Sequence, residues 1–306
     1  MTPAKSARDF LHPRYWPTWL ALALLWPFSR LPVPVLWALG GALGQLLYFV
    51  HARGRRSATR NIALCFPELS AGARARLVRR HYRALGLAAV GVSFAWWGSA
   101  RRQRKLIGMR DREHYDRALA AGRAIILLAP HFLALQFGGL CLVRERPIVS
   151  MYKQARNPLI DWLMRRRRLR YGGYFVERDA SLRPLIRRLR AGEPFYYLPD
   201  QNPGDAAHVF APFFGIPAAT VTALARMAQL ADAVVIPCFT KQLAYGRGYE
   251  IIFKPPLENF PSGDELLDAT RMNAAIEEGV REMPEQYMWT YKRFKQRPPG
   301  EPNLYG

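Results

Sequence analysis

Beyond residue 50, short apolar runs alternate along the chain with segments in which apolar residues recur at helical spacing. Short apolar runs bounded by Gly, Pro or Asp are typical of buried strands. The predicted strands are 124–130, 147–152, 195–200, 233–239 and 248–256, and the helices between them include 181–192 and 218–232. Strands that alternate with helices predict an α/β fold with a mixed, mainly parallel central sheet flanked by helices.

The segment 55–97 is predicted to begin as a loop and to continue as a long helix. Ser70 precedes the helical pattern and is predicted to be its N-cap, because a serine hydroxyl accepts hydrogen bonds from the first turn. Apolar residues such as Leu77 and Leu85 then recur at helical spacing.

Two apolar runs, 15–28 and 35–50, dominate the first 50 residues. Each is shorter than the about 20 residues that a helix needs to span a bilayer core. Trp16, Trp19 and Trp26 suit a membrane interface, and basic residues flank both runs, which predicts that both ends stay cytoplasmic. No small-residue cleavage site follows the first run, so a cleaved signal is not predicted.

The pattern thus predicts a membrane anchor over residues 1–54, followed by an α/β domain over residues 55–306. The anchor is either one tilted span or a pair of helices that lie in the interface. Ordinary buried helices are the alternative.

Charge narrows the choice of partners, since 45 Lys and Arg against 23 Asp and Glu give a formal net charge of +22. Such an excess indicates nucleic acid, an anionic membrane or a phosphorylated substrate, unless the chain is simply basic throughout. No zinc-finger spacing, RNP-type motif or basic zipper is present, so a membrane is favoured over nucleic acid. Cys65, Cys141 and Cys238 are far apart and predict neither disulfides nor a zinc site, which fits a reducing compartment.

His131 follows the predicted strand 124–130, at the edge where open α/β sheets usually bind ligands. An imidazole titrates near neutrality, so this residue is a candidate general base. A carboxylate on its second nitrogen would fix the tautomer and stabilise the imidazolium. Gln136 stands five residues on, where its carbonyl oxygen can hold the ring but supplies no negative charge. A lone histidine at a strand end is also a common structural feature.

Other candidates for chemistry have structural alternatives. The run RRRRLR at 165–170 matches phosphate oxygens or forms a solvated helix face. Asp200 and Gln201 end a predicted strand and are candidate substrate contacts or turn residues. Gly215, and a helix expected to start after Pro217, offer backbone N–H groups to an anion or form a packed turn.

The segment from Trp289 through Tyr291 and Arg293 to Lys295 mixes aromatic and basic side chains. It is predicted to form either a membrane-proximal edge or a clasp that holds the C-terminal end to the sheet.

The stretch HFLALQFGG at 131–139 resembles the H-x4-D/E motif of glycerolipid-type acyltransferases, and most of all the version in lipid A biosynthesis acyltransferases. Further blocks are similar to that family in order and spacing along almost the whole chain. They are HPRYWPTW, RNIALCFPELS, MYKQARNPLIDWL, LPDQNPG, FAPFFGIPAATVTALARMA and PEQYMWTYKRFKQRP. The opening and closing blocks look most like the lauroyl-type branch. The chain departs from the motif at Gln136, where the family has Glu or Asp.

The resemblance implies an enzyme that transfers a fatty acyl chain, lauroyl or similar, from acyl carrier protein to a hydroxyl of a lipid A precursor in lipopolysaccharide biosynthesis. It implies a place on the cytoplasmic face of the bacterial inner membrane, with no metal or cofactor besides the acyl donor. His131 and Gln136 would be the catalytic residues. The acceptor and its phosphates would be held by Arg168 and Arg170, which match an R-x-R pair, and by Arg156, Asn157, Asp200 and Gln201.

Three interpretations of Gln136 stay open. It orients His131 as a weakened base, another acid such as Asp200 compensates for it, or the chain is an impaired paralogue that binds lipid without transferring it. A lysophospholipid or an aminolipid is the alternative acceptor.

Overall fold

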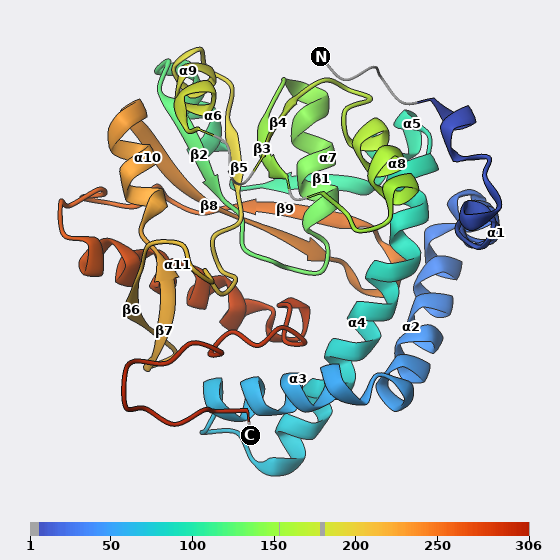
Figure 1. The fold of residues 1–306 in the computed structure, drawn as a ribbon, viewed down its shortest axis with the longest axis horizontal. Helices are drawn as coiled ribbons and strands as arrows, with labels where there is room; N and C mark the ends of the chain where they lie inside the picture. The colour runs from blue at the N-terminus through green and yellow to red at the C-terminus, as the bar shows by residue number, and fades with distance from the viewer. Residues whose placement is uncertain (1–5, 153, 178–180, 306) are drawn as a thin grey trace.

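A computed structural model describes residues 6–152, 154–177 and 181–305. Its centre is one seven-stranded sheet of order β1-β9-β8-β2-β5-β3-β4 (Figure 1). Neighbouring strands are parallel except β8 and β9, so the predicted mixed, mainly parallel sheet is confirmed. The strands are β1 (Ile107–Arg110), β2 (Ala124–Leu128), β3 (Val149–Tyr152), β4 (Tyr174–Glu177), β5 (Phe195–Tyr197), β8 (Ala233–Gln242) and β9 (Tyr249–Phe253).

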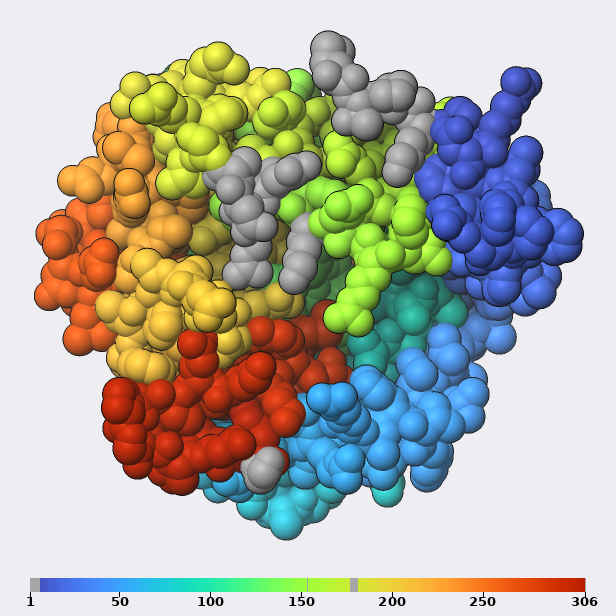
Figure 2. Space-filling view, in the orientation of Figure 1, coloured from blue at the N-terminus to red at the C-terminus, as the bar shows by residue number. Residues whose placement is uncertain are grey.

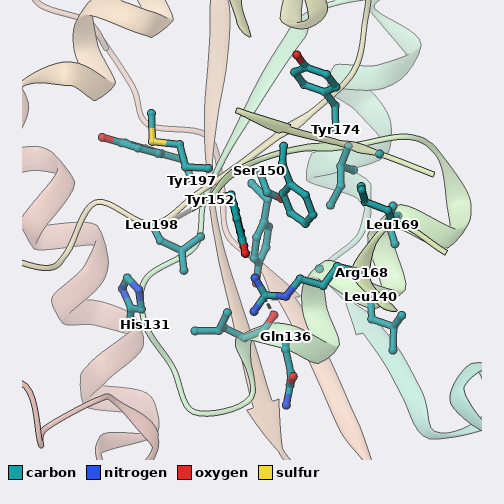
Figure 3. A pocket seen from close by; sticks show the side chains of 18 of the residues that line it. His131, Gln136, Leu140, Ser150, Tyr152, Arg168, Leu169, Tyr174, Tyr197 and Leu198 are labelled. Carbon is teal, nitrogen blue, oxygen red and sulfur yellow. Dashed lines mark hydrogen bonds between the residues drawn. The ribbon is translucent and has the colours of Figure 1, made fainter. Parts of the chain in front are cut away.

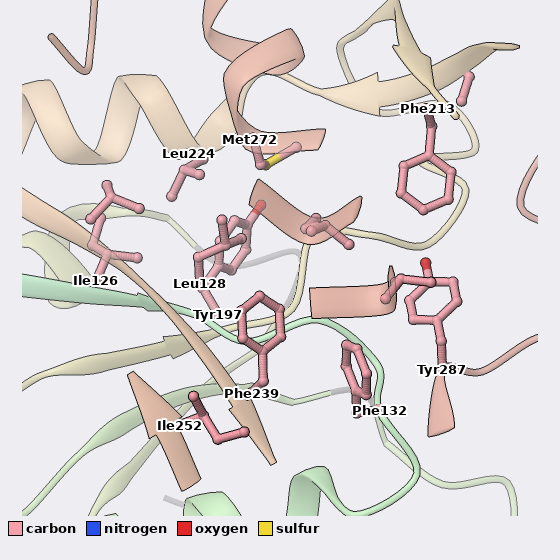
Figure 4. Packing of buried hydrophobic residues seen from close by; sticks show 14 of the residues in the cluster. Ile126, Leu128, Phe132, Tyr197, Phe213, Leu224, Phe239, Ile252, Met272 and Tyr287 are labelled. Carbon is pink, nitrogen blue, oxygen red and sulfur yellow. The ribbon is translucent and has the colours of Figure 1, made fainter. Parts of the chain in front are cut away.

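Helices cover both faces of this sheet. The α-helices of the described residues are α1 (Trp16–Leu25), α2 (Val33–Val50), α3 (Ala52–Cys65), α4 (Ala71–Trp97), α5 (Ala100–Leu106), α6 (Glu113–Ala120), α7 (Leu135–Glu145), α8 (Pro158–Arg168), α9 (Arg183–Arg190), α10 (Ala223–Ala231) and α11 (Glu265–Glu282). Ile126 and Leu128 of β2 pack in the core under α9, α10 and α11 (Figure 4), whereas Leu127 packs in the opposite core with residues of α6 and α7. Burial on both faces explains why the strand is uniformly apolar.

The predicted helix 218–232 is wrong over its first residues. Residues Ile216–Val221 form strand β7, which pairs antiparallel with β6 (His208–Phe213) in a hairpin apart from the main sheet. Phe214 and Gly215 make the turn with φ values of 52° and 72°, the two successive positive φ angles that a tight hairpin requires. Helix α10 begins only at Ala223, so no helix starts after Pro217 to present N–H groups there.

The loop predicted ahead of α4 is also wrong, because α3 occupies most of it. Its many arginines conceal an apolar stripe in which Ala58, Ile62 and Cys65 are buried at helical spacing. The predicted cap of the next helix is confirmed, since the Ser70 hydroxyl accepts a hydrogen bond from the N–H of Ala73 at 3.2 Å. Strands β1 and β4 were not predicted; each is a four-residue edge strand.

Helix α2 packs along α4 with the two backbones in direct contact. A Cβ on Gly44 would lie 2.3 Å from the Tyr82 carbonyl oxygen, and a Cβ on Gly86 would lie 2.3 Å from the Gly40 carbonyl oxygen. Only glycine permits this approach, so one face of α2 is buried against α4. Among the described residues, α2 is the one helix long and apolar enough to cross a membrane, with a mean hydropathy of 1.6.

The opposite face of α2 and much of α1 are exposed (Figure 1). Large apolar side chains on these surfaces include Trp16, Leu20, Leu24, Leu46 and Phe49, all more than half exposed. The alternative of ordinary buried helices therefore fails for these surfaces. The first five residues of the predicted anchor lie outside the described residues.

Candidate active site

His131 and Asp200 come together at the carboxyl edge of the sheet. β2 and β5 are parallel neighbours with Leu128 paired to Tyr197, and each of the two residues lies three positions beyond its strand. The backbone N–H of His131 donates to Asp200 Oδ2 at 2.9 Å, and its ring Nδ1 lies 2.7 Å from Asp200 Oδ1. Register alone thus aligns two residues that are 69 positions apart in the sequence.

The charge state of Asp200 follows from its surroundings. Its side chain is 2% exposed, and burial by itself raises the pKa of a carboxyl. The charge and hydrogen bonds of His131, together with the charge of Arg293, outweigh burial and hold the pKa of Asp200 below its usual value. The carboxylate is therefore ionised, Nδ1–H of His131 donates to it, and the lone pair of Nε2 is left for a substrate.

Tyr287 completes the buried surroundings of Asp200. It was not among the residues predicted to form the site. Burial, and then the charge and hydrogen bond of Asp200, raise the pKa of Tyr287 well above its usual value. The adjoining backbone is hydrogen-bonded to the loop that follows β2 and carries His131, called the histidine loop. Met288 N–H donates to the His131 carbonyl at 3.0 Å, and Leu133 N–H donates to the Gln286 carbonyl at 2.8 Å. Its place in the block PEQYMWTYKRFKQRP was the available signal.

The segment around Tyr287 is the clasp that was one of the two predicted alternatives. Trp289 is fully buried and Arg293 is 2% exposed, which excludes both from a membrane-facing edge. The Arg293 guanidinium donates to the Ala219 carbonyl at 2.7 Å, and the Asn61 amide donates to the Trp289 carbonyl at 2.8 Å. The C-terminal segment therefore joins α3, the β6–β7 hairpin and the histidine loop.

A mainly apolar cavity of about 540 Å³ opens beside His131. Figure 3 shows His131 at the lower left of the view, Tyr174 at the upper right and the guanidinium of Arg168 at the lower centre. In Figure 2 this face of the molecule is hollowed where the yellow-green, gold and red segments approach one another. Further lining side chains come from β3, β5, α7 and the segment after α8, and include Leu140, Val143, Ile148, Tyr152, Leu169 and Leu198.

Gly138 lets α7 approach the sheet beside this cavity. A Cβ at this position would lie 2.2 Å from Thr240 Oγ1 and 2.9 Å from the Tyr196 hydroxyl oxygen. The Tyr196 hydroxyl donates instead to the Leu135 carbonyl at 3.0 Å. The first glycine of the pair in HFLALQFGG therefore has a packing reason as well as its place in a motif.

A family model of bacterial lipid A biosynthesis acyltransferases matches residues 4–296 of the chain. The chain belongs to this family. It is 35% identical over 302 residues to the lipid A biosynthesis lauroyltransferase of Escherichia coli (strain K12), and 34% identical over 302 residues to the palmitoleoyltransferase of that strain; both alignments cover 98% of each chain. It is 30% identical over 304 residues to the myristoyltransferase of the same strain, over 97% of this chain and 93% of the relative. These identities do not separate the lauroyl-type from the palmitoleoyl-type relatives.

Gln136 occupies the position where the resemblance leads one to expect an acid of this acyltransferase family. It lies in the first turn of α7 and lines the cavity. Within the ranges that the structure describes, no hydrogen bond joins its side chain to His131, and Figure 3 shows it pointing away from the ring. The structure thus places Asp200, and not Gln136, against the imidazole.

The predicted arginine pair separates in the structure. Arg168 faces the cavity, where desolvation lowers the pKa of its guanidinium. Arg170 turns away and donates to the Trp96 carbonyl at the end of α4 at 3.0 Å and to Gln103 Oε1 in α5 at 2.7 Å. The structure therefore brings only the first of the two arginines to the cavity.

The remaining predicted acceptor residues have mixed placements. Gln201 lines the cavity next to Asp200. Arg156 is exposed and is not part of the cavity lining. Asn157 caps α8, with its side-chain oxygen accepting from the N–H of Leu159 at 3.0 Å. Of this group, only Gln201 and Asp200 lie beside His131.

Proposed function

We propose that this enzyme transfers a fatty acyl chain from acyl carrier protein to a hydroxyl of a lipid A precursor in lipopolysaccharide biosynthesis. The observation that carries the proposal is the hydrogen-bonded pair of His131 and buried Asp200 beside a mainly apolar cavity. A cavity of about 540 Å³ falls in the size range of small-molecule sites, and its apolar lining suits an alkyl chain. Family membership supports the class of acceptor.

The reaction needs one base and no covalent intermediate. His131 Nε2 removes the proton of the acceptor hydroxyl while the oxygen attacks the thioester carbonyl carbon, so that a C–O bond forms and the C–S bond breaks. The imidazolium then returns the proton to the departing sulfur. Asp200 holds the ring in the reactive tautomer and stabilises its positive charge during the transfer. Gln136 takes no part in these proton transfers.

Arg168 supplies a cation inside the cavity. No carboxylate of the described residues forms an ion pair with it, and the fork of a guanidinium matches the geometry of phosphate oxygens. Arg168 therefore binds a phosphate of the acceptor. Arg170 acts indirectly, since its bonds to Trp96 and Gln103 hold the segment after α8 against α4 and α5.

The exposed apolar faces of α1 and α2 attach the enzyme to the cytoplasmic face of the inner membrane. Basic residues stand among them, since the guanidinium groups of Arg30 and Arg83 lie over the rings of Trp26 and Trp37. Such a surface suits anionic headgroups above an apolar interior. Because α2 is packed on α4 through glycines, it lies in the interface and does not cross the bilayer alone.

The proposal is tested with the purified full-length enzyme, an acyl carrier protein thioester and a lipid A precursor, with the product identified by mass spectrometry. We expect His131→Ala to lower the rate by about 10²–10⁴-fold, the usual contribution of a general base, in a variant that thermal unfolding shows to be still folded. An unchanged rate in this variant would show that His131 is not the base. Lysophospholipid and aminolipid acceptors are assayed in parallel, and a faster reaction with either would replace the proposed acceptor.

A further inference from the structure

A basic groove lies between α9 and α10, outside the site described above. It encloses about 790 Å³ and is lined by four arginines, namely Arg183, Arg187, Arg190 and Arg226. Leu182, Ile186 and Leu230 provide apolar surface between them. Leu230 is 43% exposed, so its side chain is accessible to a partner in the groove.

The positive charge of this groove is not neutralised by the described residues. None of its four arginines forms an ion pair with a described carboxylate, whereas the neighbouring Arg188 pairs with Glu193 at 2.7 Å. Arg190 donates to the Leu230 carbonyl, which fixes one arginine at the rim. Repulsion among uncompensated charges is tolerated where an acidic partner binds.

The groove adjoins the acyl cavity directly. Leu182 lines both spaces. Helix α10 also runs between them, because Ala223 at its start lines the cavity while Arg226 and Leu230 further along line the groove. A molecule bound in the groove is thus positioned to deliver a flexible arm into the cavity.

We infer that this groove is the docking surface for an acidic acyl carrier protein, an inference that rests on the proposed function. Arginines interspersed with exposed apolar side chains suit an amphipathic helix that carries carboxylates around an apolar stripe. A membrane is the less suitable partner. In Figure 1, α9 and α10 lie on the opposite side of the molecule from α1 and α2, so one flat bilayer would not contact both surfaces.

The experiment compares two donors that carry the same acyl chain, namely acyl carrier protein thioester and acyl-pantetheine, which has no protein to dock. The test variant is Arg187→Glu with Arg226→Glu, both exposed positions. The control is Arg76→Glu with Arg80→Glu, which changes the charge equally on an exposed part of α4. Thermal unfolding of both variants is compared with that of the unmodified enzyme.

We expect the groove variant to raise KM for the carrier-protein donor at least about tenfold, to weaken its salt dependence, and to leave acyl-pantetheine turnover unchanged. Calorimetric binding of the carrier protein alone gives a second readout, which is weakened in the groove variant only. An unchanged KM and affinity, equal losses with both donors, or an equal effect of the control would each overturn the inference. Failure of the unmodified enzyme to transfer from either donor would instead refute the proposed function.

Discussion

The carboxylate of Asp200 binds His131 twice, through the backbone N–H at 2.9 Å and through ring Nδ1 at 2.7 Å. One buried acid therefore fixes both the position of the histidine loop and the orientation of the imidazole. The same acid is held by Tyr287 and influenced by Arg293 from the C-terminal segment. We propose that this arrangement lets a chain of the acyltransferase family work with an amide at position 136.

Gln136→Glu restores the acid of the family motif, and we expect no gain in the rate of acyl transfer. The side chain at this position points away from His131, whose Nδ1 is already bound to Asp200. The measurement is kcat with both substrates saturating, with Gln136→Ala as the matched control. A clear rise in kcat for the glutamate variant would mean that position 136 reaches the ring during turnover.

Replacement of Arg168 is expected to change substrate binding, whereas replacement of Arg170 is expected to change stability. Arg168→Ala removes a cation that faces the cavity, so KM for the phosphorylated acceptor rises about 10–100-fold, the range for a charge-assisted hydrogen bond. Arg170→Ala leaves the Trp96 carbonyl and Gln103 Oε1 without this donor, so the free energy of unfolding falls by about 2 kcal/mol. Steady-state kinetics and urea unfolding of both variants separate the two roles. Similar kinetic defects in the two variants, without any loss of stability, would show that Arg170 also binds the acceptor.

His81 makes stability depend on pH well above the range where Asp200 titrates. Burial lowers the pKa of His81 from 6.5 to about 4, against the smaller effect of the Glu285 carbonyl that its Nδ1–H reaches at 3.0 Å. The folded state stays neutral while the unfolded state binds a proton, so this stabilisation is complete above pH 6.5. It is lost as the pH falls towards 4, by about 3 kcal/mol in total.

We expect urea unfolding to show this loss between pH 7 and pH 4.5 and His81→Gln to reduce it, because glutamine does not titrate. Asp200 does not contribute to the loss of stability in this pH range. Its pKa is held below its usual value, so the stabilisation that its charge provides is lost only at lower pH. Equal slopes for the two proteins would refute the assignment to His81.

The sequence predicted the central strands because their apolar runs are uniform, and it placed His131 and Asp200 at strand ends. It did not establish that the two residues meet, because that depends on the pairing of β2 with β5, which no local pattern encodes. The arginines of α3 concealed a helical stripe, and the turn at Phe214 and Gly215 converted an expected helix start into a strand. Arg170 matched a motif, but its contacts with the end of α4 are tertiary and leave no signal in its spacing.

The claim that Asp200 is the acid partner of His131 is tested most directly by the kcat of Asp200→Asn, measured beside that of Gln136→Glu. The asparagine keeps the size of the side chain and removes its negative charge, so the imidazolium loses its stabilising partner. We predict a fall in kcat of about 10⁴-fold for Asp200→Asn, as for the equivalent change in a serine protease triad, with an unchanged KM for the acceptor. A kcat within a few-fold of the unmodified enzyme would contradict the claim that Asp200 is the acid partner of His131.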